Sequence, residues 1–145
     1  MFKSRWNIVW VLVACALLLS TTVSAKKQVE RPFTIRGDVT VTFVPSYYAS
    51  ATGVATHIGK YSGSAEVMGK GILIAANGDE LYWDENFYDL IWTDTTLTFT
   101  MKFTITGGTG RFEGASGSFG PVTVTADLTA TGCTFSYSAS GTIKY

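Results

Sequence analysis

The only histidine of the chain, His57, is the side chain best suited to proton transfer near neutral pH. A pocket could use its imidazole as a general acid or base. His57 has the same strand parity as Tyr61, so we expect both side chains on one side of a strand. The alternative, which we favour, is a structural histidine held by a hydrogen bond beside a turn. A lone histidine cannot anchor a zinc site without further ligands, so we predict neither a metal nor a cofactor.

The segment 79–94 combines acidic and aromatic side chains. Its carboxylates are those of Asp79, Glu80, Asp84, Glu85, Asp89 and Asp94, and its rings are those of Tyr82, Trp83, Phe87, Tyr88 and Trp92. Such a surface could stack on a sugar or bind a cation, although no calcium-loop spacing is matched. The candidate ligand-binding side chains are Tyr61, Tyr82 and Trp83. The alternative that we favour is a strand pair with acidic loops and inward-packed rings.

Paired carboxylates in this segment do not predict glycoside hydrolysis. Asp84 and Glu85 are adjacent in the sequence. Neighbouring residues of a strand point to opposite faces, so these two side chains would not face each other across a cleft.

Four windows that could position these side chains alternate apolar and polar residues with a period of two. They are 33–43, 97–105, 122–128 and 133–144, and their polar positions are rich in threonine. This period is typical of half-buried antiparallel strands, and the abundance of Thr, Val, Phe and Tyr agrees with it. No comparable window after residue 25 has a helical period.

Weaker strand signals lie between these windows. Residues 53–68 form one long bent strand or two short ones, and 71–75 is a short apolar run. Asn77-Gly78 is a strong hairpin signal, so a returning strand should start near Glu80. About eight strands joined by tight turns predict an all-β protein with a single closed antiparallel barrel, because closure removes exposed edges. A two-sheet sandwich is the alternative.

A glycine-rich string separates the second and third of the strong windows. It contains Gly107, Gly108, Gly110, Phe112, Gly114 and Gly117. The first three glycines permit positive φ and suit a turn, and the last two permit a bulge or sharp coiling of the next strand. Phe112 can plug a barrel end. The spacing does not match a dinucleotide-binding loop, and a strand rather than a helix follows.

This string resembles the Gly-Gly-Thr/Ser-Gly-x-Phe-x-Gly-Ala-x-Gly segment of plant allene oxide cyclases and dirigent proteins. The resemblance implies an eight-stranded antiparallel barrel of the calycin type, often trimeric, with a ligand cavity inside. The chain is also similar to exported bacterial proteins that carry Ala55-Thr56-His57-x-Gly59 and Ala75-Ala76-Asn77-Gly78-Asp79. Every position matched to the cyclases is a backbone or packing residue, so no catalytic role is carried over.

The first 25 residues have the features of a secretory signal peptide. Lys3 and Arg5 precede an apolar run over 6–20, and Ala25 ends a small-x-small cleavage site. We therefore expect a secreted or periplasmic protein. One alternative is a bacterial lipobox that would lipidate Cys15, although the apolar run continues beyond this cysteine. Another is an uncleaved anchor helix.

Cleavage after residue 25 would leave a short tail, 26–32, and one barrel domain, 33–145. Of the 11 basic residues 9 then remain against 11 acidic ones, which provides no electrostatic footprint for nucleic acid. Cys133 is the only cysteine of this part, so it has no internal disulfide partner, and we expect a buried thiol.

These observations predict a small secreted barrel that binds an apolar or aromatic molecule or serves as a surface or structural module. The alternative is an enzyme of the cyclase or isomerase type, which would steer a reactive intermediate in the cavity. We favour binding over catalysis because no constellation of catalytic residues emerges. A homo-oligomer, a trimer by resemblance, is the expected assembly.

Overall fold

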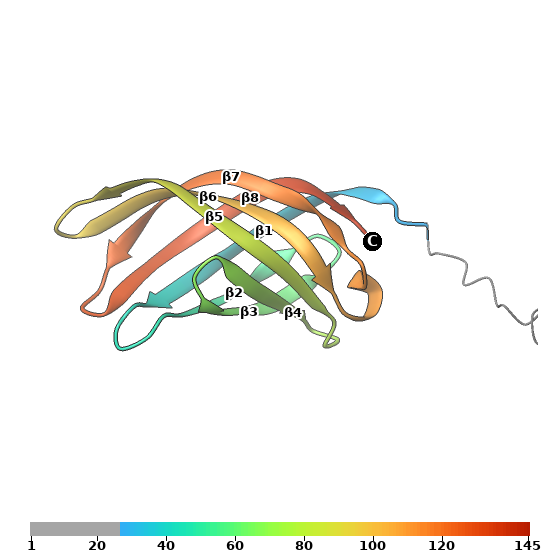
Figure 1. Ribbon diagram of the computed structural model, residues 1–145, viewed down its shortest axis with the longest axis horizontal. Helices are drawn as coiled ribbons and strands as arrows, with labels where there is room; N and C mark the ends of the chain where they lie inside the picture. The colour runs from blue at the N-terminus through green and yellow to red at the C-terminus, as the bar shows by residue number, and fades with distance from the viewer. Residues whose placement is uncertain (1–26) are drawn as a thin grey trace, which may run out of the picture.

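The computed structural model describes residues 27–145 and shows a closed barrel of eight antiparallel strands (Figure 1). The strands are β1 (Glu30–Thr42), β2 (Tyr48–Ala55), β3 (Gly59–Val67), β4 (Lys70–Ala75), β5 (Glu80–Trp92), β6 (Thr96–Gly108), β7 (Ser116–Leu128) and β8 (Gly132–Lys144). A short 3₁₀ helix, η1 (Gly110–Phe112), lies between β6 and β7. The predicted signal peptide, with Cys15, lies outside the described residues.

Each strand pairs with its neighbours in sequence, and β1 pairs with β8 to close the barrel. The closing ladder runs without interruption from Glu30 opposite Lys144 to Thr42 opposite Gly132. This confirms the predicted closed barrel and excludes the two-sheet sandwich. The segment 53–68, for which two interpretations were open, belongs to two strands, because residues 56–58 form a turn between β2 and β3. The first strand begins at Glu30, within the segment expected to be a tail.

The inward side chains fill one half of the barrel completely. Those with almost no exposed surface are Phe33, Ile35, Leu73, Leu81, Phe112, Phe119 and Ile143. The rings of Phe33, Phe103 and Phe119 are in contact, with Phe103 and Phe119 stacked at a centroid distance of 4.4 Å. Phe112 closes this end from η1, with its ring 5.2 Å from that of Tyr145. We call this half the packed end.

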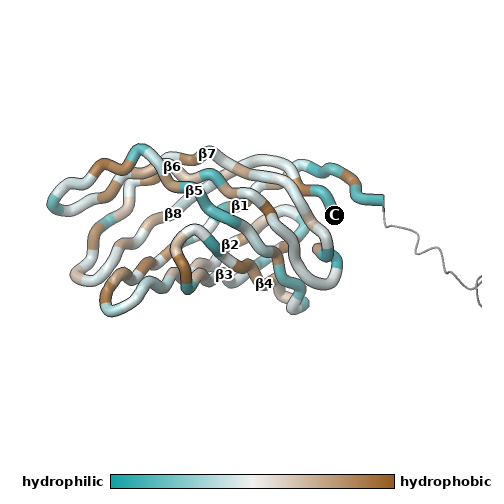
Figure 2. Tube along the Cα trace, viewed as in Figure 1, coloured by the Kyte–Doolittle hydropathy of each residue, from teal (hydrophilic) through white to brown (hydrophobic). Residues whose placement is uncertain are grey.

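The opposite end is open because the strands differ in length. β5, β6, β7 and β8 have 13 residues each, whereas β4 has 6. The barrel wall is therefore low at β3 and β4, while the β5–β6 and β7–β8 hairpins extend beyond it (Figure 1). Figure 2 shows apolar segments at the β3–β4 turn and near the tip of the β5–β6 hairpin, both at this open end. Within residues 27–145, no helix has the length and apolar character needed to span a membrane.

Candidate ligand-binding cavity

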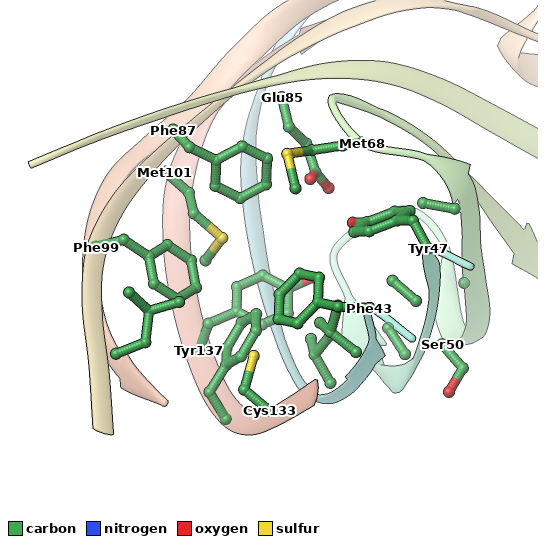
Figure 3. A pocket seen from close by; sticks show the side chains of 18 of the residues that line it. Phe43, Tyr47, Ser50, Met68, Glu85, Phe87, Phe99, Met101, Cys133 and Tyr137 are labelled. Atoms are coloured by element: carbon green, nitrogen blue, oxygen red, sulfur yellow. The ribbon is translucent and has the colours of Figure 1, made fainter. Parts of the chain in front are cut away.

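A cavity of about 300 Å³ lies inside the open half of the barrel (Figure 3). It exists because the inward positions of β2 and β3 carry small residues, namely Ala49, Ala51, Gly63 and Ala65. Ala51 lies opposite Gly63 in the β2–β3 ladder, so no large side chain projects from this wall. Small residues on one wall leave space that the side chains of the facing wall do not fill.

The remaining walls are mostly aromatic and aliphatic. Their large side chains are Val39, Val41, Phe43, Tyr47, Met68, Trp83, Phe87, Leu97, Phe99, Met101, Phe103, Phe135 and Tyr137. Phe99 packs against Phe87 at 5.8 Å and edge-on against Phe135 at 5.3 Å, measured between ring centroids. These rings support one another, so the cavity is a preformed apolar space.

A bulge in β5 completes the mouth of the cavity. Trp83 and Phe87 point inward at odd positions of this strand, but Asp89 has φ 57° and the β5–β6 register shifts between Tyr88 and Ile91. After the bulge the even positions line the cavity. They are Leu90 and Trp92, which are 51% and 58% exposed and form an apolar rim.

Glu85 contributes the carboxyl group of the cavity. It shares inward parity with Trp83 and Phe87, and its carboxyl points into the cavity (Figure 3). The Trp83 Nε1–H donates a hydrogen bond of 2.7 Å to Glu85 Oε1. Burial raises the pKa of this carboxyl, and the bond from Trp83 opposes that rise only in part. The cavity thus weakens the ionisation of its own acid.

The other ionisable groups that line the cavity are also shifted toward their neutral forms. Burial, followed by the nearby Glu85 charge, raises the pKa of Tyr47 to about 12. Burial likewise raises the pKa values of Tyr137 and of the Cys133 thiol. The Tyr137 hydroxyl is hydrogen-bonded to that of Tyr61 at 3.0 Å. The interior therefore disfavours negative charge.

Glu85→Gln should raise thermal stability at pH 7.5 by a few degrees, with the gain disappearing near pH 4. Because the pKa of Glu85 is raised in the folded protein, ionisation above that pKa costs stability, whereas below the unfolded value both states are protonated. A glutamine cannot ionise and keeps an oxygen for Trp83. Thermal unfolding across this pH range measures the effect, with Asp84→Asn, on the outer face, as the matched control. A Glu85→Gln variant that is less stable at pH 7.5 would contradict the interpretation.

The structure places His57 far from the cavity. It lies in the exposed β2–β3 turn with φ 69°, its Nε2 is 2.9 Å from the carbonyl oxygen of Pro32, and its ring is 5.9 Å from that of Tyr145. The expectation that His57 and Tyr61 share one side of a strand is wrong, because the turn breaks the strand and Tyr61 is buried in the barrel.

The three candidate ligand-binding residues occupy different places. Trp83 lines the cavity, with its ring against the backbone of Gly71, where a Cβ would be 2.5 Å from the indole. Tyr61 does not line the cavity, but its hydroxyl is hydrogen-bonded to that of Tyr137, which does. Tyr82 has outward parity, and its hydroxyl donates to the Glu80 carboxylate at 2.5 Å.

The glycine string lies at the packed end. Positive φ values occur at Gly107 (154°), Gly110 (55°), Gly114 (71°) and Gly117 (136°). Gly108 instead allows a close approach, because a Cβ there would be 2.3 Å from the Glu80 carbonyl oxygen. The string therefore shapes the packed end and does not line the cavity.

Sequence reasoning did not select Glu85 or Tyr47 as site residues. Glu85 was one carboxylate of the acidic segment, and its parity with Leu81, Trp83 and Phe87 was the signal that it faces inward. Tyr47 lies between β1 and β2, outside any alternating window, so no pattern pointed to it.

Comparison of the chain with protein-family models, with curated proteins and with solved structures finds no match. Among residues 27–145, no group of histidine, cysteine and carboxylate side chains is arranged to hold a metal ion. The cavity itself is therefore the basis for a functional assignment.

Proposed function

We propose that this barrel binds one small apolar or aromatic molecule in its cavity. The observation that carries the proposal is the preformed cavity of about 300 Å³, lined almost wholly by apolar side chains around one carboxyl group. Sites for small molecules have this character, and their volumes range from roughly 300 to 1,000 Å³. The volume suits a ligand of two or three aromatic rings.

The rim supports the same function. Met68, Leu90 and Trp92 line the mouth, and each is more than half exposed. Exposed apolar side chains gathered at a cavity entrance are typical of a binding site, because they gain contacts when an apolar molecule enters. The mouth and the glycine string lie at opposite ends of the barrel. Binding is therefore assigned to the open end, and stability to the packed end.

Export, assembly and family membership belong to the same proposal. The N-terminal signal features support a secreted or periplasmic carrier, and the glycine string supports a relation to the allene oxide cyclase and dirigent barrels. A trimer is the assembly that this relation implies. Native mass spectrometry of the purified protein would report the mature N-terminus, any lipid on Cys15 and the number of subunits in one measurement.

Titration with N-phenyl-1-naphthylamine tests the binding function, because this dye fluoresces strongly only in an apolar site. We expect one dye molecule per chain and a Kd of about 1–100 μM. Competition by unlabelled naphthalene derivatives should displace it. Absence of saturable binding, or a stoichiometry well above one, would contradict the proposal.

A second candidate function is isomerisation of a reactive ligand, with Glu85 as a general acid. The raised pKa of Glu85 and its place in an apolar cavity beside Tyr47 favour it, because such a carboxyl keeps its proton to a higher pH than an exposed glutamate does. Proton transfer from the Glu85 carboxyl to the oxygen of an aryl epoxide would break the benzylic C–O bond. A 1,2-hydride shift to the benzylic cation and return of the proton to the Glu85 carboxylate would then give the isomeric arylacetaldehyde. Faster opening by the wild type than by Glu85→Gln would support catalysis, and equal rates would leave the binding function alone.

A further inference from the structure

We propose that the preferred ligand is a hydrophobic amine, with its ammonium group on the Glu85 carboxylate and its apolar body among the surrounding rings. This inference rests on the proposed binding function and names the class of ligand. It follows from the charges, the hydrogen bonds and the rings around Glu85.

Among the described residues 27–145, those that line the cavity include an acid and no base. Its ionisable lining residues are Tyr47, Glu85, Cys133 and Tyr137, and of these the Glu85 carboxyl is the strongest acid by type. The basic residues on the strands next to Glu85 point out of the barrel. Lys70 on β4 is the register partner of Asp84, and Lys102 on β6 is that of Asn86, and both pairs occupy outward positions. A ligand cation would therefore be the only positive charge next to Glu85 inside the barrel.

The hydrogen bonding of Glu85 is one-sided. Trp83 donates to Oε1, and the Glu85 backbone N–H donates to the Gly69 carbonyl oxygen at 2.8 Å. No side chain among residues 27–145 donates to Oε2. A partly buried carboxylate with spare acceptor capacity is stabilised by a charged donor, and an ammonium group supplies both the charge and the hydrogen bonds.

The rings around the carboxyl suit a cation as well. Trp83 and Phe87 lie two residues before and after Glu85 on the same face of β5, and Phe103 is its register partner on β6. Aromatic faces attract ammonium groups, and a carboxylate among rings is the usual recognition chemistry for them. A ligand carboxylate would instead meet the Glu85 charge in a space that already disfavours anions.

Three ligands of matched shape test the inference: 2-naphthylmethylamine, 2-naphthalenemethanol and 2-naphthoic acid, each used to displace the dye at pH 7.5. For the wild type, we expect the amine to bind at least about tenfold more tightly than the alcohol, and the acid to bind most weakly. Glu85→Gln should weaken amine binding at least about tenfold and change alcohol binding less than about threefold. Asp84→Asn, which removes the neighbouring outward carboxylate, should keep the wild-type order.

A pH titration of the wild type supplies a second readout that needs no variant. Amine affinity should fall on acidification as Glu85 is protonated, while alcohol affinity stays constant. The other titratable groups facing Glu85, Tyr47 from the β1–β2 loop and Cys133 and Tyr137 from β8, have raised pKa values and stay neutral over this range. From the β3–β4 turn and β6 the facing residues are Met68 and Phe103, which do not titrate.

The outcomes separate the two proposals. Equal binding of amine and alcohol by the wild type, a preference for the acid, or an amine preference that survives Glu85→Gln would overturn the amine assignment while the binding function stands. Failure of the dye and of all three ligands to bind would overturn the binding function itself, and the amine assignment with it.

Discussion

Ala51→Trp is expected to weaken binding of the naphthyl dye by at least tenfold, because the new indole would occupy the space that the ligand needs. Ala51 lies in the middle of the small-residue wall, opposite Val39 on β1 and Gly63 on β3. Its Cβ faces the cavity. An indole there fits existing empty space, so the fold should tolerate it while ligand affinity falls.

Fluorescence titration measures this loss, and a graded series adds resolution. Ala51→Val and Ala51→Leu should give intermediate affinities in the order of side-chain volume. Ala76→Trp is the matched control, because Ala76 is exposed in the β4–β5 turn at the packed end. If Ala51→Trp and Ala76→Trp bound the dye equally well, the ligand would have to bind outside the cavity.

Phe119→Ala is expected to reduce the free energy of unfolding by about 3–5 kcal/mol, the largest stability effect that we predict for one side chain. Phe119 is almost completely buried and stacks on Phe103 at 4.4 Å, with Phe33 at 5.2 Å on another side. Truncation would leave a void at the packed end, where the neighbouring rings cannot move in to fill it.

Urea unfolding followed by circular dichroism measures this change, with Phe43→Ala as the matched control. Phe43 is partly exposed beside the cavity, so its truncation enlarges an existing space and should cost only about 1 kcal/mol. Equal losses for the two variants would contradict the division of the barrel into a packed end and a hollow end.

The sequence predicted the inward apolar faces of the strands but not the division of the barrel into a packed end and a hollow end. Alternation over 33–43 and 97–105 correctly predicted which residues of β1 and β6 face inward, because the pleat of a strand fixes the side of every second residue. The segment 53–68 gave a weaker alternation of apolar and polar residues because its inward residues, such as Gly63 and Ala65, are small. The same small residues leave the space of the cavity. A local pattern cannot show that such residues lie across the barrel from Phe99 and Phe135.

The bulge at Asp89 marks a second limit. Simple alternation would continue the odd parity of Trp83, Glu85 and Phe87 through Ile91, and would therefore place Trp92 outside. The positive φ at Asp89 reverses the parity, so that Leu90 and Trp92 line the mouth while Ile91 is 62% exposed. Asp is among the non-glycine residues that adopt positive φ most readily, but its presence at position 89 does not by itself show that the strand bulges there.

The amino-acid sequence by itself determined the four strongly alternating strands, their inward faces and the tight Asn77-Gly78 turn, since each depends on contacts between residues close in the chain. Closure of β1 on β8, the cavity beside Ala51 and the burial of Glu85 were decided only by the tertiary structure. These features depend on pairing between residues far apart in the sequence, such as Glu30 and Lys144. They also depend on the combined volume of the side chains that face each other across the barrel. Function in this protein is proposed from that second group of features, because an apolar space and a buried carboxyl exist only once the barrel has closed.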